Sequence, residues 1–372
     1  MVYIHIPYCR RRCTYCAFYS QTVRGDIDRY LAALAAEIAA RSDGHTVRTL
    51  YLGGGTPSTL STNQLDALFN ALAKGYDLGH IEECTLECNP EDLTPQYLAD
   101  LRALGLVNRL SIGLQSFDDG ILRLVNRVHT ASTAVDALRR AAEASFDNLS
   151  VDLIYGLPTQ TVGHFGRDLQ RIATLAGEGI GIRHLSCYAL SIEPGTILEH
   201  QIAAGRIAVA DDDTVAAQYD TLLRWCSDTG FMQYEVSNFC LDGYASKHNS
   251  RYWDRTPYTG YGAAAHSFDG LTRRWNVADK QRYIEAVESG LPCHESETLS
   301  ADDAYNEYLM TALRTTRGVL KSMVDSAFRD ELAAAMRPYV DAGWIVDTPL
   351  AYRPTPHGLL HADGIAASLF HI

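Results

Sequence analysis

Residues 1 to about 190 alternate short β-type runs with helical patterns, and this rhythm restricts the possible folds more than any other feature of the chain. Successive strands joined by helical crossovers lie parallel, with right-handed connections. The pattern therefore predicts an α/β fold with a parallel sheet, either doubly wound or closed into a partial barrel. The six predicted strands are residues 2–6, 49–52, 83–87, 109–114, 149–154 and 184–190.

The helices between these strands have recognisable start signals. Apolar residues from Ile27 to Ile38 recur at helical spacing and form one stripe. Ser61 and Gln64 have the spacing of a capping box, and Thr94 before Pro95 is typical of an N-cap followed by proline in the first turn. Each signal predicts a helix that begins at that point.

The position of polar and small residues favours a barrel over a doubly wound sheet. They lie at or towards the carboxyl ends of the predicted strands, which is the functional face of (β/α) barrels. We therefore expect a partial barrel of six βα units, incomplete relative to eight. The residues in these positions are Cys9, Gly53–Gly55, Glu87, Gln115, Asp152 and Ala189.

The rhythm ends near residue 190, which indicates a further domain. We expect the barrel core in residues 1–200, a connecting region in 201–276 with a helix near 213–227, and a smaller C-terminal domain in 277–372. The last part has mainly helical patterns and a short β element at 344–353. A chain of 372 residues, 47% of them hydrophobic, is long enough for one large domain and a smaller one.

Three cysteines follow the first strand with the spacing CxxxCxxC: Cys9, Cys13 and Cys16. Three thiolates can hold three irons of a cubane cluster and leave the fourth iron without a protein ligand. A small molecule can chelate such an iron and accept an electron from it. A structural zinc site needs four ligands, so a zinc site completed by a distant residue stays an alternative.

Composition narrows the functional classes. The net charge of −13 argues against nucleic-acid binding, because phosphates would be repelled. Nine cysteines, an odd number without a disulfide-like spacing, suit a reducing compartment. We find no secretory signal and no apolar run of the ~18 residues that a membrane helix needs. These features predict a cytoplasmic protein without a transmembrane segment.

A series of motifs gives the chain a family resemblance. They are Tyr3-Ile-His-Ile-Pro7, the cysteine run, Tyr51-Leu-Gly-Gly-Gly-Thr-Pro57, Glu87-Cys-Asn-Pro90, Leu110-Ser-Ile-Gly-Leu-Gln115, Val125-Asn-Arg127 and Val151-Asp-Leu-Ile-Tyr-Gly-Leu-Pro158. In this order and spacing the chain resembles the radical S-adenosylmethionine superfamily. Within it, the chain is most similar to the branch that contains oxygen-independent coproporphyrinogen oxidase and the HemW heme chaperones.

The resemblance implies the cofactors and their ligands. Cys9, Cys13 and Cys16 would hold a 4Fe-4S cluster, and S-adenosylmethionine would chelate the fourth iron. One electron into its sulfonium would yield a 5′-deoxyadenosyl radical. Residues implied to contact S-adenosylmethionine are Tyr3, Tyr15, Gly54, Gly55, Thr56, Glu87, Gln115, Arg127, Asp152 and Ala189. The last four match positions that the oxidase uses around a second S-adenosylmethionine.

Within this branch, three features favour a heme chaperone. The chain lacks the oxidase's extension before the first strand, and it has Phe18 where the oxidase has a further cysteine. It also contains an HNxxYW element that is linked to heme binding in HemW proteins: His248, Asn249, Tyr252 and Trp253. An imidazole can ligate heme iron, so His248 is the expected axial ligand. The implied partners are heme, an apo-hemoprotein acceptor and a reductant for the cluster.

Several alternatives stay open. The protein could be the oxidase, another radical enzyme, or a zinc-bound interaction module. Arg10, Arg11 and Arg12 are either a solvated loop or a positive surface beside the cluster. We expect the C-terminal domain and residues 234–275 to cover the barrel mouth. Ala17 and the pair Ala263-Ala264 depart from the family pattern, which has Asp at the first position and Pro-Gly at the pair.

Overall fold

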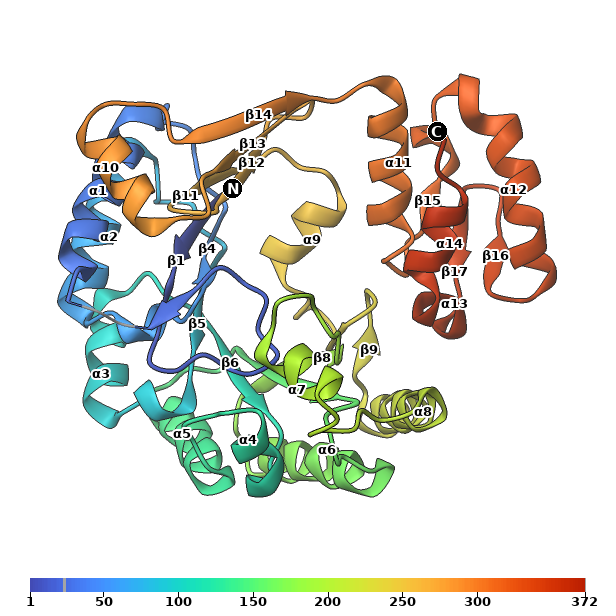
Figure 1. The fold of residues 1–372 in the computed structure, drawn as a ribbon, viewed down its shortest axis with the longest axis horizontal. Helices are drawn as coiled ribbons and strands as arrows, with labels where there is room; N and C mark the ends of the chain where they lie inside the picture. Colours follow the sequence, from blue (N-terminus) through green and yellow to red (C-terminus); the bar gives the residue numbers. More distant parts are fainter. Residues whose placement is uncertain (23–24, 372) are drawn as a thin grey trace.

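The computed structural model describes residues 1–22 and 25–371. Six neighbouring parallel strands lie in chain order at the centre of a nine-stranded sheet (Figure 1), which confirms the predicted partial barrel. Every predicted strand is present, with bounds that differ by at most two residues. The strands are β1 (Val2–Ile6), β4 (Thr49–Gly54), β5 (Glu83–Cys88), β6 (Arg109–Gln115), β7 (Leu149–Tyr155) and β8 (Ile182–Ala189).

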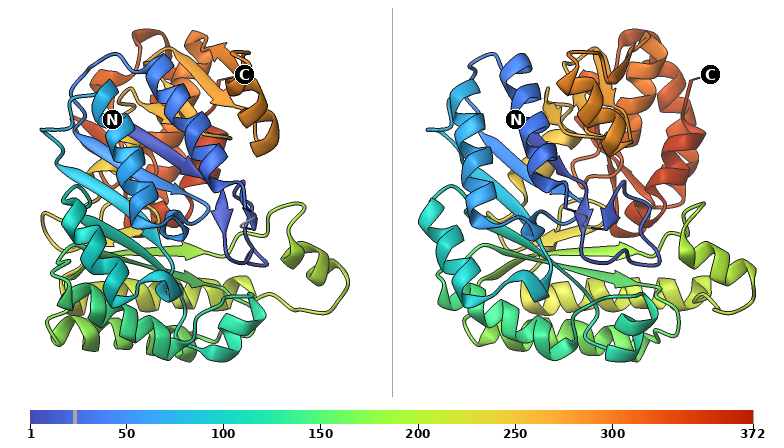
Figure 2. Two further views of the ribbon diagram at one scale, coloured as in Figure 1. Left: turned by 90° about the vertical axis from the view of Figure 1, so that its left-hand side faces the viewer. Right: turned by 60° about the vertical axis from the view of Figure 1, so that its left-hand side comes forward.

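Helices cover the outer face of this sheet (Figure 2). The predicted capping box of Ser61 and Gln64 is present at the start of its helix, and Thr94 caps the next helix with Pro95 in its first turn. The expected apolar stripe buries Tyr30, Leu34 and Ile38. The helices of this layer are α1 (Ile27–Arg41), α2 (Thr62–Gly75), α3 (Pro95–Leu104), α4 (Asp119–Leu124), α5 (Ala131–Glu143), α6 (Val162–Gly177) and α8 (Asp212–Thr229).

Short strands from the connecting region extend both edges of the six-stranded core. β11 (Thr259–Tyr261) pairs in parallel with β1, and β10 (Asn238–Cys240) pairs antiparallel with β8. β9 (Met232–Gln233) pairs in turn with β10. Between them, α9 (Lys247–Trp253) begins against the amino ends of β4 and β5, because Glu83 accepts hydrogen bonds from the backbone of Lys247 and His248.

A small three-stranded sheet and one helix follow the barrel. β12 (His266–Phe268), β13 (Thr272–Asn276) and β14 (His294–Thr298) form the sheet. α10 (Lys280–Glu288), between β13 and β14, packs on α1, where Tyr283 lies close to Tyr30. Helix α10 thus lies against the barrel.

A second hydrophobic core forms from residues between Tyr305 and Leu369. This C-terminal part is mainly helical, as the sequence predicts (Figure 1). It also contains a three-stranded sheet, of which the sequence predicted only the short β element at 344–353. The boundary at residue 277 stays a prediction. The elements are α11 (Ala301–Ala312), α12 (Arg329–Asp341), α13 (Pro356–Leu360), α14 (Ala362–Ser368), β15 (Val319–Leu320), β16 (Ile345–Asp347) and β17 (Ala351–Pro354).

Among the described residues, every helix is too short or too polar to cross a lipid bilayer.

Candidate functional site

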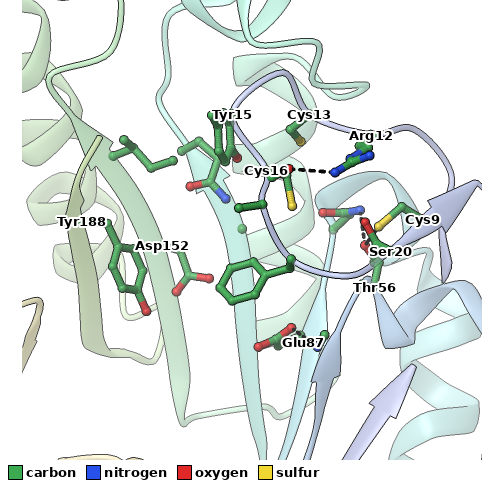
Figure 3. Close-up of a pocket in the computed structure, with 18 of the residues that line it drawn as sticks. Cys9, Arg12, Cys13, Tyr15, Cys16, Ser20, Thr56, Glu87, Asp152 and Tyr188 are labelled. Carbon is green, nitrogen blue, oxygen red and sulfur yellow. Dashed lines mark hydrogen bonds between the residues drawn. The ribbon is translucent and has the colours of Figure 1, made fainter. Parts of the chain in front are cut away.

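A cavity of about 610 Å³ opens at the carboxyl ends of the barrel strands (Figure 3). Of the described residues, those that line it lie between Tyr3 and Glu193, so residues 234–275 do not reach it. The expectation that this segment covers the barrel mouth is therefore wrong for this cavity. The structure brings together here all three cluster cysteines and all ten residues implied for S-adenosylmethionine.

The three cysteines belong to one loop above the strand ends. The loop leaves β2 (Tyr8–Cys9) and returns through β3 (Gln21–Thr22), which pairs with β2. The Sγ of Cys9 accepts a hydrogen bond from Thr56 at 3.5 Å, and the Sγ of Cys13 accepts one from Arg127 at 3.5 Å. All three cysteines are free thiols that line the cavity.

Three cysteines on one loop are a donor set that suits a cubane cluster. Within residues 1–22 and 25–371, no three His, Cys, Asp or Glu side chains lie close enough together to hold one metal ion. A zinc ion would draw its thiolates to about 2.3 Å from one centre. A cubane binds each cysteine to a different iron, so its cysteine sulfurs stand farther apart. Cys9, Cys13 and Cys16 line one cavity, where each could bind a different iron of such a cluster.

The glycines at the end of β4 are required by close packing. Gly54 has a φ of +103°, and a Cβ there would lie 2.4 Å from the His5 ring. A Cβ on Gly55 would lie 2.7 Å from the carbonyl oxygen of Ile6. The ends of β1 and β4 thus meet with no room for side chains, and the backbone of β4 forms part of the cavity wall.

Glu87, at the end of β5, is held by two donors. The Tyr51 hydroxyl donates to its Oε1 at 2.7 Å, and the Gly54 amide donates to its Oε2 at 3.2 Å. Burial raises the pKa of Glu87 to about 7. A carboxyl group in this position can accept hydrogen bonds from a bound amino group near neutral pH.

Arg127 and Asn89 connect the cysteine loop to the strand ends. The Arg127 guanidinium donates to Asn89 Oδ1 at 2.8 Å and to the carbonyl of Gly113, while its buried Nε has no hydrogen-bond partner. The Asn89 amide donates to Thr56 Oγ1 at 3.2 Å. Asn89 is a site residue that was not predicted from the sequence, although it lies in the Glu87-Cys-Asn-Pro motif.

The opposite wall is built by β6, β7 and β8. Asp152 accepts a hydrogen bond from Ser111 at 3.3 Å, and burial raises its pKa to about 6. Gln115 has a φ of +70° where the register between β6 and β7 shifts, which turns the strand end at the cavity. Tyr188 and Phe18 also line the cavity, although their side chains are 43% and 72% exposed. Neither aromatic residue was predicted from the sequence to belong to the site.

The three consecutive arginines, Arg10 to Arg12, have different roles. Arg10 forms an ion pair with Asp92, whose side chain is buried and also accepts a hydrogen bond from Ser58 at 2.7 Å. Arg11 and Arg12 are exposed and line the cavity. Arg10 therefore anchors the cysteine loop, and the other two give its rim a positive charge.

The HNxxYW element lies apart from this cavity. His248 is 1% exposed, and its Nδ1 and Nε2 make hydrogen bonds with Thr49 Oγ1 at 3.1 Å and Tyr252 Oη at 3.2 Å. Its ring stacks on Tyr51 with a centroid distance of 5.1 Å. Trp253 lies under the guanidinium of Arg314. Asn249, like the other three residues, does not line the cavity.

Comparisons with known proteins agree with this architecture. Residues 3–172 match the model of the radical SAM superfamily, and residues 299–361 match that of the HemN C-terminal domain. Coproporphyrinogen III oxidase (HemN) from Escherichia coli has a similar structure, with a TM-score of 0.84 over 99% of this chain and 89% of that chain. At 24% sequence identity, this similarity concerns the fold.

Curated relatives define the family more narrowly. The heme chaperone HemW of Mycobacterium tuberculosis (strain ATCC 25618 / H37Rv) is 37% identical over 343 residues, which cover 90% of this chain and 86% of the relative. The heme chaperone HemW of Bacillus subtilis (strain 168) is 35% identical over 325 residues, which cover 86% of this chain and 84% of the relative. The chain therefore belongs to the HemW heme chaperone family, within the radical SAM superfamily.

Proposed function

We propose that this protein is a heme chaperone, which binds heme and transfers it to apo-hemoproteins. The observation that carries the proposal is its 37% identity to a HemW heme chaperone over 90% of the chain. The absence of a cysteine at Phe18 supports it against the oxidase. The acceptor protein, a reductant for the cluster and a cytoplasmic location are further parts of the proposal.

The cavity at the strand ends is proposed to hold a 4Fe-4S cluster and S-adenosylmethionine. Cys9, Cys13 and Cys16 would bind the cluster, which supplies an electron and an iron with an open position when bound. Arg127 offers a partly unsatisfied guanidinium for a carboxylate, and Glu87 offers a carboxyl group for an amino group. Both groups are fixed by neighbouring side chains before any ligand arrives.

The cluster assignment has its own test. Anaerobic reconstitution with iron and sulfide is expected to give the broad visible absorption of a 4Fe-4S cluster in the wild-type protein and not in Cys13→Ala. Cys84→Ala is the matched control, because Cys84 is a buried thiol on β5 outside the cavity. Equal iron and sulfide content in wild type and Cys13→Ala would contradict the assignment, and so would stoichiometric zinc.

The chaperone function is tested by heme binding and transfer. Reconstituted protein is titrated with heme under anaerobic conditions and followed in the Soret region. It is then mixed with an apo-hemoprotein whose holo spectrum differs from that of the donor. Saturable binding near one heme per chain, followed by transfer, is the expected result. Conversion of coproporphyrinogen III to protoporphyrinogen would instead identify an oxidase.

The role of His248 as a heme ligand stays a prediction. In this structure its two ring nitrogens have partners inside the protein, so iron could reach it only after α9 moved away from β4. Alternatively, the HNxxYW element affects heme binding indirectly, by supporting the fold around Tyr51, on which the His248 ring stacks. The two roles are separable by comparing stability with heme affinity in His248 variants.

A further inference from the structure

A second cavity, of about 400 Å³, lies between the three-stranded sheet and α10. This volume is within the range of about 300–1,000 Å³ that small-molecule sites occupy. Much of its wall is apolar and comes from the β13–α10 connection, from α10 and from the residues before β14: Val277, Ala278, Ala286 and Pro292. None of the motifs assigned to the cluster or to S-adenosylmethionine contributes to it.

Two histidines, His266 and His294, line this cavity, and His266 is held in a fixed orientation. His266 lies directly opposite Trp275 in the antiparallel pair of β12 and β13. The two rings stack with a centroid distance of 6.1 Å and an interplanar angle of 25°. The side chain of His266 is exposed, and within the described chain neither of its nitrogens makes a hydrogen bond. The indole thus holds the plane of an imidazole whose nitrogens are free to bind iron.

The charge state of this imidazole suits a metal ligand, because a neutral ring is the form that ligates. Partial burial and the nearby positive charge of Arg273 lower the pKa of His266. His248 is less accessible to iron than His266, because it is buried and both of its ring nitrogens make hydrogen bonds within the protein.

The cavity also contains a cation suited to a carboxylate. Arg282 projects from α10 and lines the cavity, its side chain is exposed, and it has no ion-pair partner in the described residues. By contrast, Arg29 on α1 is paired with Glu288 at the other end of α10. Glu295, opposite Trp275 on β14, is the acidic residue of the lining and leaves Arg282 to attract an anionic group.

The cavity is mechanically connected to the cluster loop. Lys280, the first residue of α10, donates its backbone N–H to the Tyr19 hydroxyl, and its Nζ forms an ion pair with Asp26 at 2.6 Å. The Tyr19 carbonyl makes a hydrogen bond of 2.9 Å with His5 Nε2, beside Gly54. A ligand that moves α10 would therefore act on the loop that follows Cys16.

We propose that this cavity is the heme seat, with His266 as an axial ligand of the iron and Arg282 as the partner of a propionate. The inference rests on the proposed chaperone function and gives it a site. An apolar wall, imidazoles at His266 and His294, and one free guanidinium suit a planar macrocycle with an iron centre and peripheral carboxylates; of the two imidazoles, His266 is the one that stacks on Trp275. An open site of this kind also suits a protein that must release heme again.

The test is an anaerobic titration of the full, cluster-reconstituted chain with ferric heme. Wild type is compared with His266→Ala, Arg282→Glu and His357→Ala, the last as a control because His357 is an exposed imidazole on α13 outside both cavities. We expect His266→Ala to lose at least the ~10- to 100-fold in affinity that removal of an outer-shell partner of a metal ligand costs. Its Soret maximum should also shift. Arg282→Glu should weaken binding about tenfold without moving the Soret maximum, and His357→Ala should match wild type.

The outcomes separate the site from the function. Wild type that binds no heme would refute the proposed function itself. Wild type that binds heme, with unchanged affinity and Soret maximum in His266→Ala, would refute this site and leave the function standing. Far-UV circular dichroism and cluster absorption of each variant establish that it is folded. His266 contributes an exposed side chain to a strand pair, so its removal should leave both unchanged.

Discussion

Replacement of His248 by alanine should destabilise the apo-protein strongly at neutral pH. The side chain is 1% exposed and makes hydrogen bonds with Thr49 and Tyr252, while its ring stacks on Tyr51. Thr49 is itself fully buried, and its hydroxyl has no other side-chain partner in the described residues. Removal of the imidazole therefore leaves a buried hydroxyl unsatisfied and a cavity beside Tyr51.

The size of the effect follows from these losses. A buried polar group left without its partner costs about 1–3 kcal/mol, and the cavity left by a truncated core side chain adds to this. We expect the free energy of unfolding to fall by about 3–4 kcal/mol at pH 7.5. Tyr252→Phe removes one of the hydrogen bonds and keeps the imidazole, so it should cost about 1 kcal/mol.

The destabilisation should shrink at acidic pH. Burial lowers the pKa of His248 to about 3, below the ordinary value of 6.5. Below pH 6.5 the unfolded chain binds a proton at His248 that the folded protein refuses, so wild-type stability falls as the pH falls. Between pH 7.5 and pH 5 this linkage removes about 2 kcal/mol from the wild type and nothing from His248→Ala. The difference between them should therefore narrow to about 1–2 kcal/mol at pH 5.

Urea unfolding of apo-protein at both pH values, followed by circular dichroism and tryptophan fluorescence, measures these differences. The two signals must coincide before one free energy is assigned, because the chain has two hydrophobic cores. A His248→Ala protein within 0.5 kcal/mol of wild type at pH 7.5 (roughly the ordinary scatter of surface substitutions) would refute the reasoning. So would a difference that grows at pH 5.

Two other predictions concern single positions. Ala264 has a φ of +63°, which costs a Cβ-bearing residue about 1–2 kcal/mol. After subtraction of the entropy cost of glycine, Ala264→Gly should stabilise the fold by about 0.5–1 kcal/mol. The midpoint of thermal unfolding should therefore rise, and a lower midpoint would contradict the assigned strain. Asn89→Ala removes the bridge from Arg127 to Thr56 and should weaken S-adenosylmethionine binding about tenfold in calorimetry. Unchanged affinity would exclude Asn89 from that site.

The barrel could be predicted because its signals are local. Each strand is a short, mainly apolar run, and helices begin after capping residues such as Ser61 and Thr94. The extensions of the sheet edges carried no such signal. β11 is three residues long and pairs with β1 from more than two hundred residues away, so neither periodicity nor turn chemistry indicates its partner.

Site residues, too, could be predicted where local signals place them and could not where their role depends on long-range contacts. Residues at the carboxyl ends of parallel strands share one edge of the barrel, so placing the strands also placed Glu87, Gln115 and Asp152 in one cavity. Asn89 was missed because its role depends on contacts with Arg127 and Thr56 that no spacing encodes. His248 could not be placed either, because α9 lies outside the repeating βα pattern.

The position of His248 changes how a heme-binding defect in this element must be interpreted. Its ring stacks on Tyr51, and the hydroxyl of Tyr51 donates to Glu87 in the cavity at the other end of the barrel. Loss of His248 would release Tyr51 and weaken one of the two donors that hold Glu87. A variant at this position can therefore lose heme through a disturbed barrel. Only a comparison with His266, whose side chain is exposed and whose removal should leave the barrel intact, separates a lost iron ligand from a lost support.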